Sequence, residues 1–291
     1  MAESTKAGHA FPGAVDLSDK EFEMFRRLIF DMSGINLNEG KKELVRTRLG
    51  KRLRTGGFGS YMDYYKFVKN DISGAELVSL LDAISTNLTS FFREMGHFDF
   101  LKRVIIPELA EKKRATGDMS VRVWSAGCST GEEPYSLAFT LMDNLETIQT
   151  WDVKILASDL STQVLGKASR GLYTENQIKT VPKETLRKYF DKEHSDDAPL
   201  YRIKPEVRQL IQFKRFNLMS PSFPFKRKFE FIFCRNVMIY FDKPTQQTLV
   251  NKFYDVLAVG GYLLIGHSES LTGVQHRFKY VQPTVYRKMA P

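Results

Sequence analysis

The apolar residues of the first ninety positions predict a small all-α domain. They recur every three or four residues, which is the spacing of one helix face, in four separate segments. These segments are 18–33, 41–54, 61–68 and 75–84. At the starts of the first and last segments, Ser18 with Glu21 and Ser73 with Glu76 have the spacing of a capping box. We therefore expect a helical domain over residues 16–90, preceded by a flexible tail at 1–15.

After residue 115 the pattern changes to short apolar runs that alternate with helical segments. The runs that predict strands are 121–126, 153–157, 210–213, 229–234 and 261–266. Helical periodicity lies between most of them, as in 134–145 and 243–257. Such alternation is typical of an α/β fold, with a parallel sheet covered by helices on both faces. Residues 278–281 and 284–288 predict an antiparallel hairpin at the end.

The length of 291 residues also favours two domains. We expect a linker helix over 91–115 and the α/β domain over 116–291. The polar stretch at about 168–208, between the second and third predicted strands, indicates an insertion into this domain.

Composition is that of an ordinary globular protein, with 42% apolar and 26% charged residues. Its only cysteines, Cys128 and Cys234, exclude a disulfide scaffold and fit a reducing compartment. No apolar run approaches the roughly 20 residues of a membrane helix, and the first fifteen residues lack the apolar core of a secretion signal. We therefore expect a cytoplasmic protein that does not insert into a membrane.

The formal net charge of +9 is concentrated in part on residues 41–54, where seven basic residues face one acid, Glu43. A stripe of this kind binds phosphates or an acidic protein surface, or else is a solvated helix face. No zinc-finger spacing or RNA-recognition motif accompanies the charge. We therefore expect no nucleic-acid partner.

The segment 125–136 follows the first predicted strand and opens a helix. Gly127 and Gly131 permit a tight turn in which a ligand approaches the backbone. Dinucleotide enzymes place pyrophosphate at such a helix N-terminus, but Glu132 and Glu133 would repel it. The two carboxylates favour a cationic ligand group, as in S-adenosylmethionine; alternatively, they only complement the helix dipole.

Polar residues also follow three later strands at their carboxyl ends, where open α/β sheets bind ligands. Asp159 is placed to accept hydrogen bonds from ribose hydroxyls or to cap the next helix. Asn217 is suited to an adenine edge or to a turn alone, and Arg235 with Asn236 forms a polar pair. We expect no metal site, because no ligand spacing relates His97, His194, His267 and His276.

Four motifs together resemble those of the CheR-type chemotaxis receptor methyltransferases. They are STNLTSFFRE at 85–94, SAGCSTGEEPYSLA at 125–138, FEFIFCRNVMIYF at 229–241 and GGYLLIGHSES at 260–270. The resemblance runs from about residue 16 to 289. It implies an N-terminal helical domain and a Rossmann-like methyltransferase domain that contains a small inserted β-subdomain. The implied reaction is methyl transfer from S-adenosylmethionine to glutamate side chains on the cytoplasmic helices of chemoreceptors, which forms methyl esters for chemotactic adaptation.

The resemblance also assigns roles to individual residues. Together with Gly127, the implied cofactor contacts are Asn87, Thr89, Arg93, Glu132, Glu133, Asp159, Asn217, Leu218, Arg235 and Asn236. Arg93 and Tyr240 are the positions implied to place the substrate carboxylate. Some relatives have alanine at position 127, a difference that we expect to change nothing essential.

The basic stripe gains a purpose from the same resemblance, because receptor methylation segments are acidic helices in this family. Lys42, Arg46 and Arg54 are the residues that we expect to bind them. In some relatives the inserted subdomain docks on a C-terminal pentapeptide of the receptor, and the sequence leaves this open here. We expect the protein to act as a monomer.

The implied chemistry needs few catalytic groups. A glutamate carboxylate, with a pKa of about 4.3, is already ionised at neutral pH and needs no general base. The leaving group is a neutral thioether, which needs no general acid. Three alternatives stay open: a methyltransferase with an RNA or small-molecule acceptor, a binding module without turnover, and a dehydrogenase, which Glu132 and Glu133 disfavour.

Overall fold

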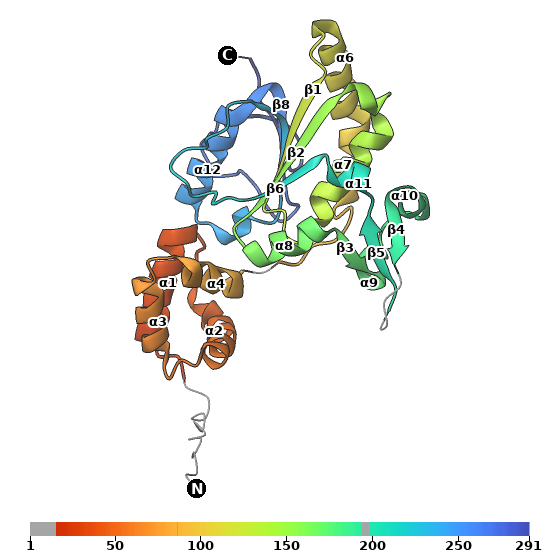
Figure 1. Cartoon of the computed structure of the whole chain (residues 1–291). Helices are drawn as coiled ribbons and strands as arrows, with labels where there is room; N and C mark the ends of the chain where they lie inside the picture. Colours follow the sequence, from red (N-terminus) through yellow and green to blue (C-terminus); the bar gives the residue numbers. More distant parts are fainter. Residues whose placement is uncertain (1–15, 86, 194–197, 291) are drawn as a thin grey trace. The chain divides into compact units, whose positions relative to one another are not determined.

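The computed structural model describes residues 16–85, 87–193 and 198–290. The described chain divides into two compact units, of which the first ends at Ile84 and the second contains Met32–Asn36 and the chain from Ser85 onward (Figure 1). The predicted tail at 1–15 lies outside the described residues. None of the helices in the described residues is long and apolar enough to cross a membrane.

The first unit is all-α, as predicted. Phe25, Leu49 and Tyr64 are fully buried in its core. The predicted capping box at the first helix is confirmed: the Glu21 N–H donates to Ser18 Oγ (3.3 Å), and the Ser18 N–H donates to Glu21 Oε2 (3.0 Å). The elements are α1 (Asp19–Ser33), the short η1 (Glu39–Lys41), α2 (Lys42–Gly56), α3 (Tyr61–Asn70) and α4 (Ala75–Ile84).

The second predicted capping box is wrong. The Glu76 N–H donates to the carboxylate of Asp71 (2.7 Å), and Ser73 does not receive it. The Glu76 side chain points inward instead, where its Oε1 accepts from Arg52 Nε (2.7 Å) and from the Tyr64 hydroxyl (2.9 Å). A charge-assisted bond to a guanidinium is stronger than a bond to a backbone amide at a solvated helix end. The tertiary partner therefore decides where this carboxylate lies.

The second unit is built on a seven-stranded sheet with the strand order β6-β2-β1-β7-β8-β10-β9. The first five of these are parallel, and β10 runs antiparallel to β8 and β9, so the predicted hairpin is confirmed. The order reverses between β1 and β7, and ligands of open α/β sheets bind at such a reversal, outside the carboxyl ends of the strands. The strands are β1 (Ser120–Ala126), β2 (Asp152–Asp159), β6 (Ile211–Arg215), β7 (Phe229–Cys234), β8 (Leu257–Ile265), β9 (Lys279–Gln282) and β10 (Val285–Arg287).

Helices cover both faces of this sheet, which confirms the predicted α/β class. Apolar side chains of α7 pack with Val123 and Ile155 on one face, whereas those of α12 pack with Trp124 and Ile232 on the other (Figure 1). The helical elements are α5 (Met95–Phe100), the π-helical η2 (Leu101–Ile105), α6 (Ile106–Thr116), α7 (Glu132–Asn144), η3 (Ile148–Thr150), α8 (Thr162–Arg170), η4 (Met238–Tyr240) and α12 (Lys243–Val256).

Two of these helices differ from the sequence prediction. The expected linker helix begins at Met95 rather than at residue 91, and it packs Phe98 and Leu101 into the core beside the sheet. Helix α7 begins at Glu132 and not at Pro134. Both glutamates of the motif therefore lie in its first turn.

The insertion forms a small antiparallel sheet of order β3-β5-β4, as expected for a β-subdomain. Three short helices accompany it. The elements are β3 (Leu172–Thr174), α9 (Glu175–Ile178), α10 (Lys183–Tyr189), β4 (Phe190–Glu193), β5 (Leu200–Ile203) and α11 (Pro205–Arg208).

Candidate functional site

The loop between β1 and α7 lies at the reversal of the strand order. The N–H groups of Gly127 and Cys128 both donate to the carbonyl of Ser158 in β2 (2.8 and 2.9 Å). Gly127, Ser129 and Gly131 all have positive φ, at 84°, 49° and 98°. Positive φ is unfavourable for residues other than glycine, so the loop has a conformation that few sequences adopt.

Both glycines of this loop also lie close to neighbouring side chains. A Cβ at Gly127 would come within 2.3 Å of Val237 Cγ2, and one at Gly131 would come within 2.9 Å of both Ala168 Cβ and Tyr173 Oη. Alanine at 127 would require Val237 to shift in this chain. The expectation that this exchange changes nothing essential is therefore not supported.

Asp159 connects the loop to its surroundings. Its Oδ2 accepts from the Ser129 N–H and its Oδ1 accepts from the Ser161 N–H (both 2.9 Å). Ser129 Oγ in turn donates to the carbonyl of Asn87 (3.0 Å). The cap of α8 is Ser161, whose hydroxyl accepts from the Val164 N–H, and not Asp159. The structure thus joins two predicted cofactor contacts, Asn87 and Asp159, through one loop.

The two glutamates at the start of α7 have different surroundings. Glu132 is 2% exposed, and its carboxylate accepts from Thr130 Oγ1 (2.6 Å) and from Gln177 Nε2 (3.4 Å). Glu133 is ion-paired with Arg235, at 3.3 Å between Oε2 and Nη1. Burial raises the pKa of both carboxyls. Because a protein cation already neutralises Glu133, Glu132 is the member of the pair that is better suited to a cationic ligand group.

Arg235 is the centre of a buried ion-pair cluster, and its side chain is only 1% exposed. Besides Glu133, it contacts Glu94, at 3.1 Å between Nη2 and Oε2, and it donates to the backbone carbonyl of Arg93. The amide of the neighbouring Asn236 lies 3.5 Å from Glu94 Oε1. The cluster therefore brings four predicted contacts together and ties the segment 92–94 to the end of β7.

Glu94 is a site residue that the sequence reasoning missed, although it stands in the FFRE motif next to Arg93. Phe92 and Glu94 both have positive φ, at 53° and 57°, which costs about 1–3 kcal/mol per residue and persists only where other contacts hold it. The Glu94 carboxylate supplies such contacts, since it also accepts from the His267 N–H (3.2 Å). Burial acts to raise the pKa of Glu94, but the charge of Arg235 and the bond from His267 more than offset it, so the pKa is lowered.

Glu269, in the GHSES motif, is a second missed residue. Its buried carboxylate accepts from the N–H groups of Gly266 (2.5 Å), Asn236 (3.0 Å) and Ile239 (3.2 Å). Burial raises its pKa. It therefore joins the loops after β7 and β8, which carry the predicted contacts Asn236 and Tyr240.

One group of side chains has the composition of a metal site. Glu94, His97 and His267 each offer a ligand atom, and these atoms lie within 4.8 Å of one another. Two nitrogens of Arg235 already lie 3.1 and 3.3 Å from Glu94 Oε2. The guanidinium therefore supplies the positive charge that a metal ion would bring, and we interpret the group as an ion-pair network.

His97 makes the stability of the protein depend on pH. It is 2% exposed, and burial together with the charge of Arg235 lowers its pKa to about 4. Its imidazole stays neutral when folded but takes up a proton near pH 6.5 when unfolded. The stability that this difference provides is complete above about pH 6.5 and is lost as the pH falls toward 4.

For the change from pH 7 to pH 5, we expect His97 to account for a loss of about 2 kcal/mol in the free energy of unfolding. Urea unfolding at the two pH values would measure it. His97→Gln, which preserves a donor toward Thr284 Oγ1, should lose about that much less than the parent. His267→Gln is the matched control, because the His267 side chain is 59% exposed. An unchanged loss in His97→Gln would refute the assignment.

Two predicted contacts of the segment after β6 are engaged within the chain. Asn217 Nδ2 donates to the carbonyl of Met32 (2.7 Å), and its Oδ1 accepts from the Met219 N–H (2.9 Å). Leu218 is 9% exposed and packs in the core beside α12. The side chain of Asn217 therefore stabilises this turn, and its adenine contact stays a prediction.

The two residues expected to place the substrate lie on different segments. Arg93 Nη1 donates to the carbonyl of Leu88, at 2.9 Å, and Thr89 follows in the same half-buried stretch. Tyr240 ends the η4 turn after β7, and its carbonyl accepts from the Asn36 N–H (2.7 Å). Their substrate contacts stay predictions.

In the first unit, the predicted receptor-binding residues lie on α2. Lys42 is ion-paired with Asp19 (2.6 Å) and Arg46 with Glu43 (2.7 Å), whereas Arg54 is exposed in the last turn. The basic stretch is thus less uniform than its sequence suggests. Its members that instead bind groups within the unit are Arg48 and Arg52.

Comparison with known proteins places the chain in a family. Residues 20–85 match the model of the CheR methyltransferase all-alpha domain, and residues 87–287 match that of the CheR methyltransferase SAM binding domain. A chemotaxis protein methyltransferase of Borreliella burgdorferi is 41% identical over 275 residues, which are 94% of this chain and 96% of that protein. The chemotaxis protein methyltransferase of Escherichia coli K12 is 38% identical over 272 residues, which are 93% and 91% of the two chains.

These matches run from the first helix to the last strand of the sheet, so the family, fold class and cofactor expected from the motifs are confirmed. The residue roles within the site were not part of these matches and stay predictions. The chain belongs to the CheR methyltransferase family, and it is a methyltransferase of chemotaxis whose cofactor is S-adenosylmethionine.

Proposed function

We propose that this protein methylates glutamate side chains of chemoreceptors in the cytoplasm, forming methyl esters that serve chemotactic adaptation. The observation that carries the choice of acceptor is the protonation chemistry around the reversal of the strand order. Cys128 and Cys234 are fully buried, and burial raises the pKa of both thiols well above its usual value. His97 is buried as well. An acceptor that is ionised beforehand fits such surroundings better than a hydroxyl or amine that must first lose a proton.

The reaction then depends on orientation more than on proton transfer. S-adenosylmethionine supplies a methyl group on a positively charged sulfur. A glutamate oxygen of the acceptor forms the new bond to the methyl carbon while the carbon–sulfur bond breaks, and the electron pair goes to sulfur to give S-adenosylhomocysteine. Alignment of the reacting atoms contributes on the order of 7–11 kcal/mol in well-oriented systems. In this proposal Arg93 orients the acceptor carboxylate and Tyr240 assists it.

The test is a methyl-transfer assay with labelled S-adenosylmethionine and a soluble cytoplasmic receptor fragment. We expect label on the fragment that mild base releases as methanol, since methyl esters are labile to base and N-methyl groups are not. A matched fragment with glutamine at the candidate glutamates should take up no label. Label found only in base-stable products or in RNA would refute a glutamate acceptor.

The basic stripe on α2 gives a prediction about receptor binding. Charge reversal at Lys42, Arg46 and Arg54 is expected to raise KM for the receptor fragment about tenfold and to reduce its dependence on salt, because long-range attraction to an acidic helix is lost. Initial rates at two salt concentrations would measure both effects, with KM for S-adenosylmethionine unchanged.

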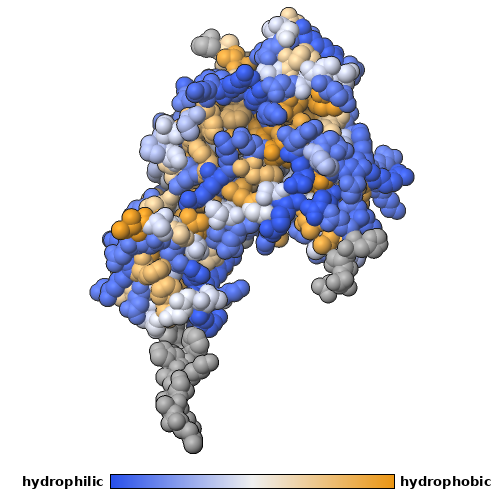
Figure 2. Space-filling view, viewed as in Figure 1, coloured by the Kyte–Doolittle hydropathy of each residue, from blue (hydrophilic) through white to orange (hydrophobic). Residues whose placement is uncertain are grey.

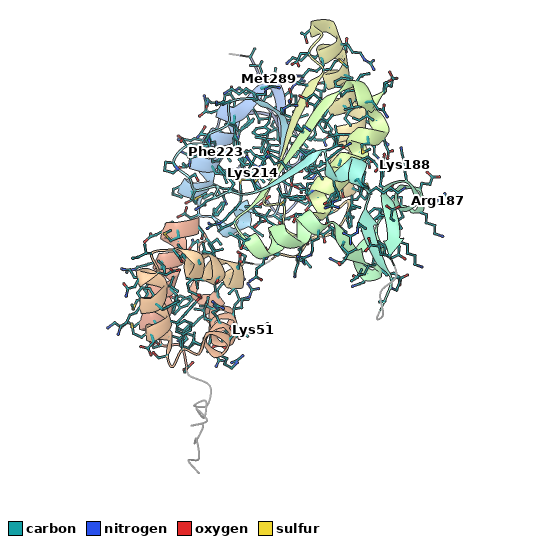
Figure 3. All side chains as sticks on the ribbon, viewed as in Figure 1. Lys51, Arg187, Lys188, Lys214, Phe223 and Met289 are labelled. Carbon is teal, nitrogen blue, oxygen red and sulfur yellow. The ribbon has the colours of Figure 1, made fainter. Side chains whose placement is uncertain are left out.

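The matched control for this experiment is Lys51→Glu. Lys51 is exposed on the same helix (Figure 3), but it follows Arg46 by five residues and so lies about 140° away around the helix axis. Equal effects of Lys51→Glu and of a single reversal at Arg46 would show that only net charge matters. In that case the stripe is not a binding site.

A further inference from the structure

One face of strands β2 and β6 lacks a covering helix. Helices α7 and α8 pack on the opposite face, where Ala157 of β2 and Phe213 of β6 point. The chain that connects β6 to β7, residues 216–228, contains no helix in the structure. Parallel strands are ordinarily connected by a crossover helix that packs on the sheet. The uncovered face is therefore the place where such a helix is missing.

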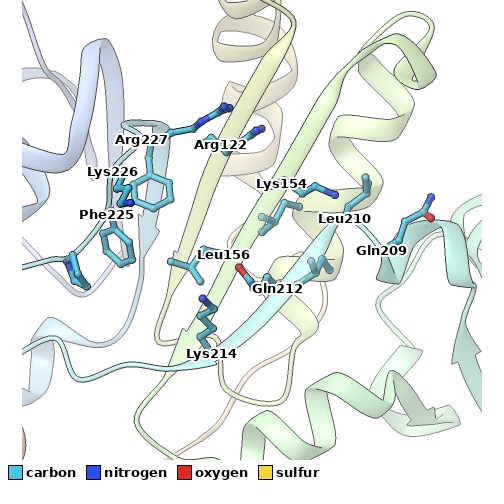
Figure 4. A pocket seen from close by; sticks show the side chains of 14 residues that line it. Arg122, Lys154, Leu156, Gln209, Leu210, Gln212, Lys214, Phe225, Lys226 and Arg227 are labelled. Atoms are coloured by element: carbon cyan, nitrogen blue, oxygen red, sulfur yellow. The ribbon is translucent and has the colours of Figure 1, made fainter.

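An open groove of about 580 Å³ lies on this face (Figure 4). Leu156 and Gln212, which are paired across β2 and β6, form part of its floor. On the far side the segment before β7 faces the strands with Phe225 and Lys226 (Figure 4). Figure 2 shows apolar surface framed by hydrophilic residues on this side of the second unit. The groove is thus apolar at its base and polar at its rims.

Five basic residues line the groove and give it a strong positive charge. Arg122 and Arg227 share one acid, Asp152. Within the described part of the chain, the three lysines of the groove make no ion pair. The five residues are Arg122, Lys154, Lys214, Lys226 and Arg227.

We propose that this groove binds an acidic amphipathic helix of a partner protein, seated on the face of β2 and β6. Leu156 and Phe225 would contact the apolar stripe of the helix, and lysines on both rims would pair with its acidic residues. Lys154 near the start of β2 and Lys214 near the end of β6 lie at opposite ends of the exposed strand surface (Figures 3 and 4). A helix along the strands would meet both. This docking surface is separate from the loops at the carboxyl ends, and the inference does not depend on which acceptor is methylated.

The floor of the groove favours a helix over a single-stranded nucleic acid. Proteins bind unpaired bases by stacking them on exposed aromatic rings beside a basic track. Phe225 is the aromatic side chain nearest the lysines, but its ring already packs against Trp124, with centroids 4.9 Å apart, and against Phe216 at 5.3 Å. Aliphatic contacts from Leu156 and Leu210 remain for the ligand. Such a floor matches the apolar stripe of an amphipathic helix.

The test uses fluorescence anisotropy with the full chain and a synthetic peptide of about 20 residues. In this peptide leucine recurs at helical spacing and glutamate fills the other positions. A second peptide has the same composition in scrambled order, without an apolar stripe, and a third probe is a single-stranded oligonucleotide of equal charge. We expect the amphipathic peptide to bind at least tenfold more tightly than either of the other probes.

Two variants locate the binding. Lys154→Glu with Lys214→Glu is expected to weaken the amphipathic peptide at least tenfold. Lys167→Glu with Lys183→Glu, an equal charge change at exposed positions of α8 and α10, is expected to change it less than twofold. Titration with S-adenosylhomocysteine checks that both double variants keep their fold.

Three outcomes would overturn the proposal. The first is the absence of measurable binding by the amphipathic peptide. The second is equal binding of the scrambled peptide, or equal loss in both double variants, which would reduce the effect to net charge. The third is tighter binding of the oligonucleotide, lost in the Lys154 and Lys214 variant, which would assign the groove to nucleic acid.

Discussion

Replacing Arg235 with alanine is expected to lower the free energy of unfolding by about 3–5 kcal/mol, the cost of breaking a buried ion pair from one side. The Arg235 side chain is 1% exposed and lies between Glu94 and Glu133. Its removal leaves two buried carboxylates facing each other without a cation. Urea unfolding at pH 7 would measure the change, with titration of S-adenosylhomocysteine as a separate readout of the site.

The cause of that loss is testable with a second substitution. If unpaired carboxylates are responsible, adding Glu94→Gln to Arg235→Ala should restore part of the stability, although Glu94→Gln alone is destabilising. The control is Arg287→Ala, which breaks a half-exposed pair with Glu108 and should cost less than about 1 kcal/mol. A loss that is strictly additive in the double variant would contradict this account, because residues of one charge network do not act independently.

Arg93→Ala is expected to lower kcat for receptor methylation about 100-fold, the order of effect that misalignment of reacting groups produces. The backbone carbonyl that Arg235 binds is retained in this variant, and the side chain makes only a surface bond to the Leu88 carbonyl. We therefore expect the free energy of unfolding to change little. Single-turnover rates with saturating substrates would measure the chemical step.

Tyr240→Phe provides the comparison, since it removes one hydroxyl and leaves the ring. We expect it to lose less of kcat than Arg93→Ala does. Because Arg93 is also a predicted cofactor contact, the affinity for S-adenosylhomocysteine must be measured alongside. Turnover equal to that of the parent in Arg93→Ala would remove its assigned role, and a loss confined to cofactor affinity would make it a binding residue only.

Local patterns were sufficient for most of the secondary structure. Helical spacing predicted α1 to α4, and the apolar runs predicted the strands β1, β2, β6, β7 and β8, because periodicity reports directly which face of an element is buried. The ends of elements were less well predicted. Helix α7 begins at Glu132, before the proline that the sequence reasoning took as its start.

Side-chain partners were the main source of error. The serine-to-glutamate spacing is the same at Ser18 and at Ser73, yet only the first forms a capping box. What differs is the presence of Arg52 and Tyr64 beside Glu76, from helices distant in sequence. Spacing along the chain carries no information about such partners.

The same limit applied to the candidate site. Motif comparison indicated Glu133 and Arg235 separately, but their ion pair links residues 102 positions apart. Glu94 was passed over because a glutamate after an arginine in a surface-like motif has no distinctive pattern. Its role follows from burial against Arg235 and from the positive φ at Phe92 and Glu94.

The sequence by itself determined the family, the fold class and the cofactor of this protein, because short motifs and apolar periodicity are properties of consecutive residues. Only the tertiary structure decided which carboxylates face guanidinium groups, that His97 is buried beside Arg235, and that β2 and β6 present a basic groove in place of a helix. These features depend on distances between residues far apart in the chain, which folding sets through packing and the pairing of buried charge.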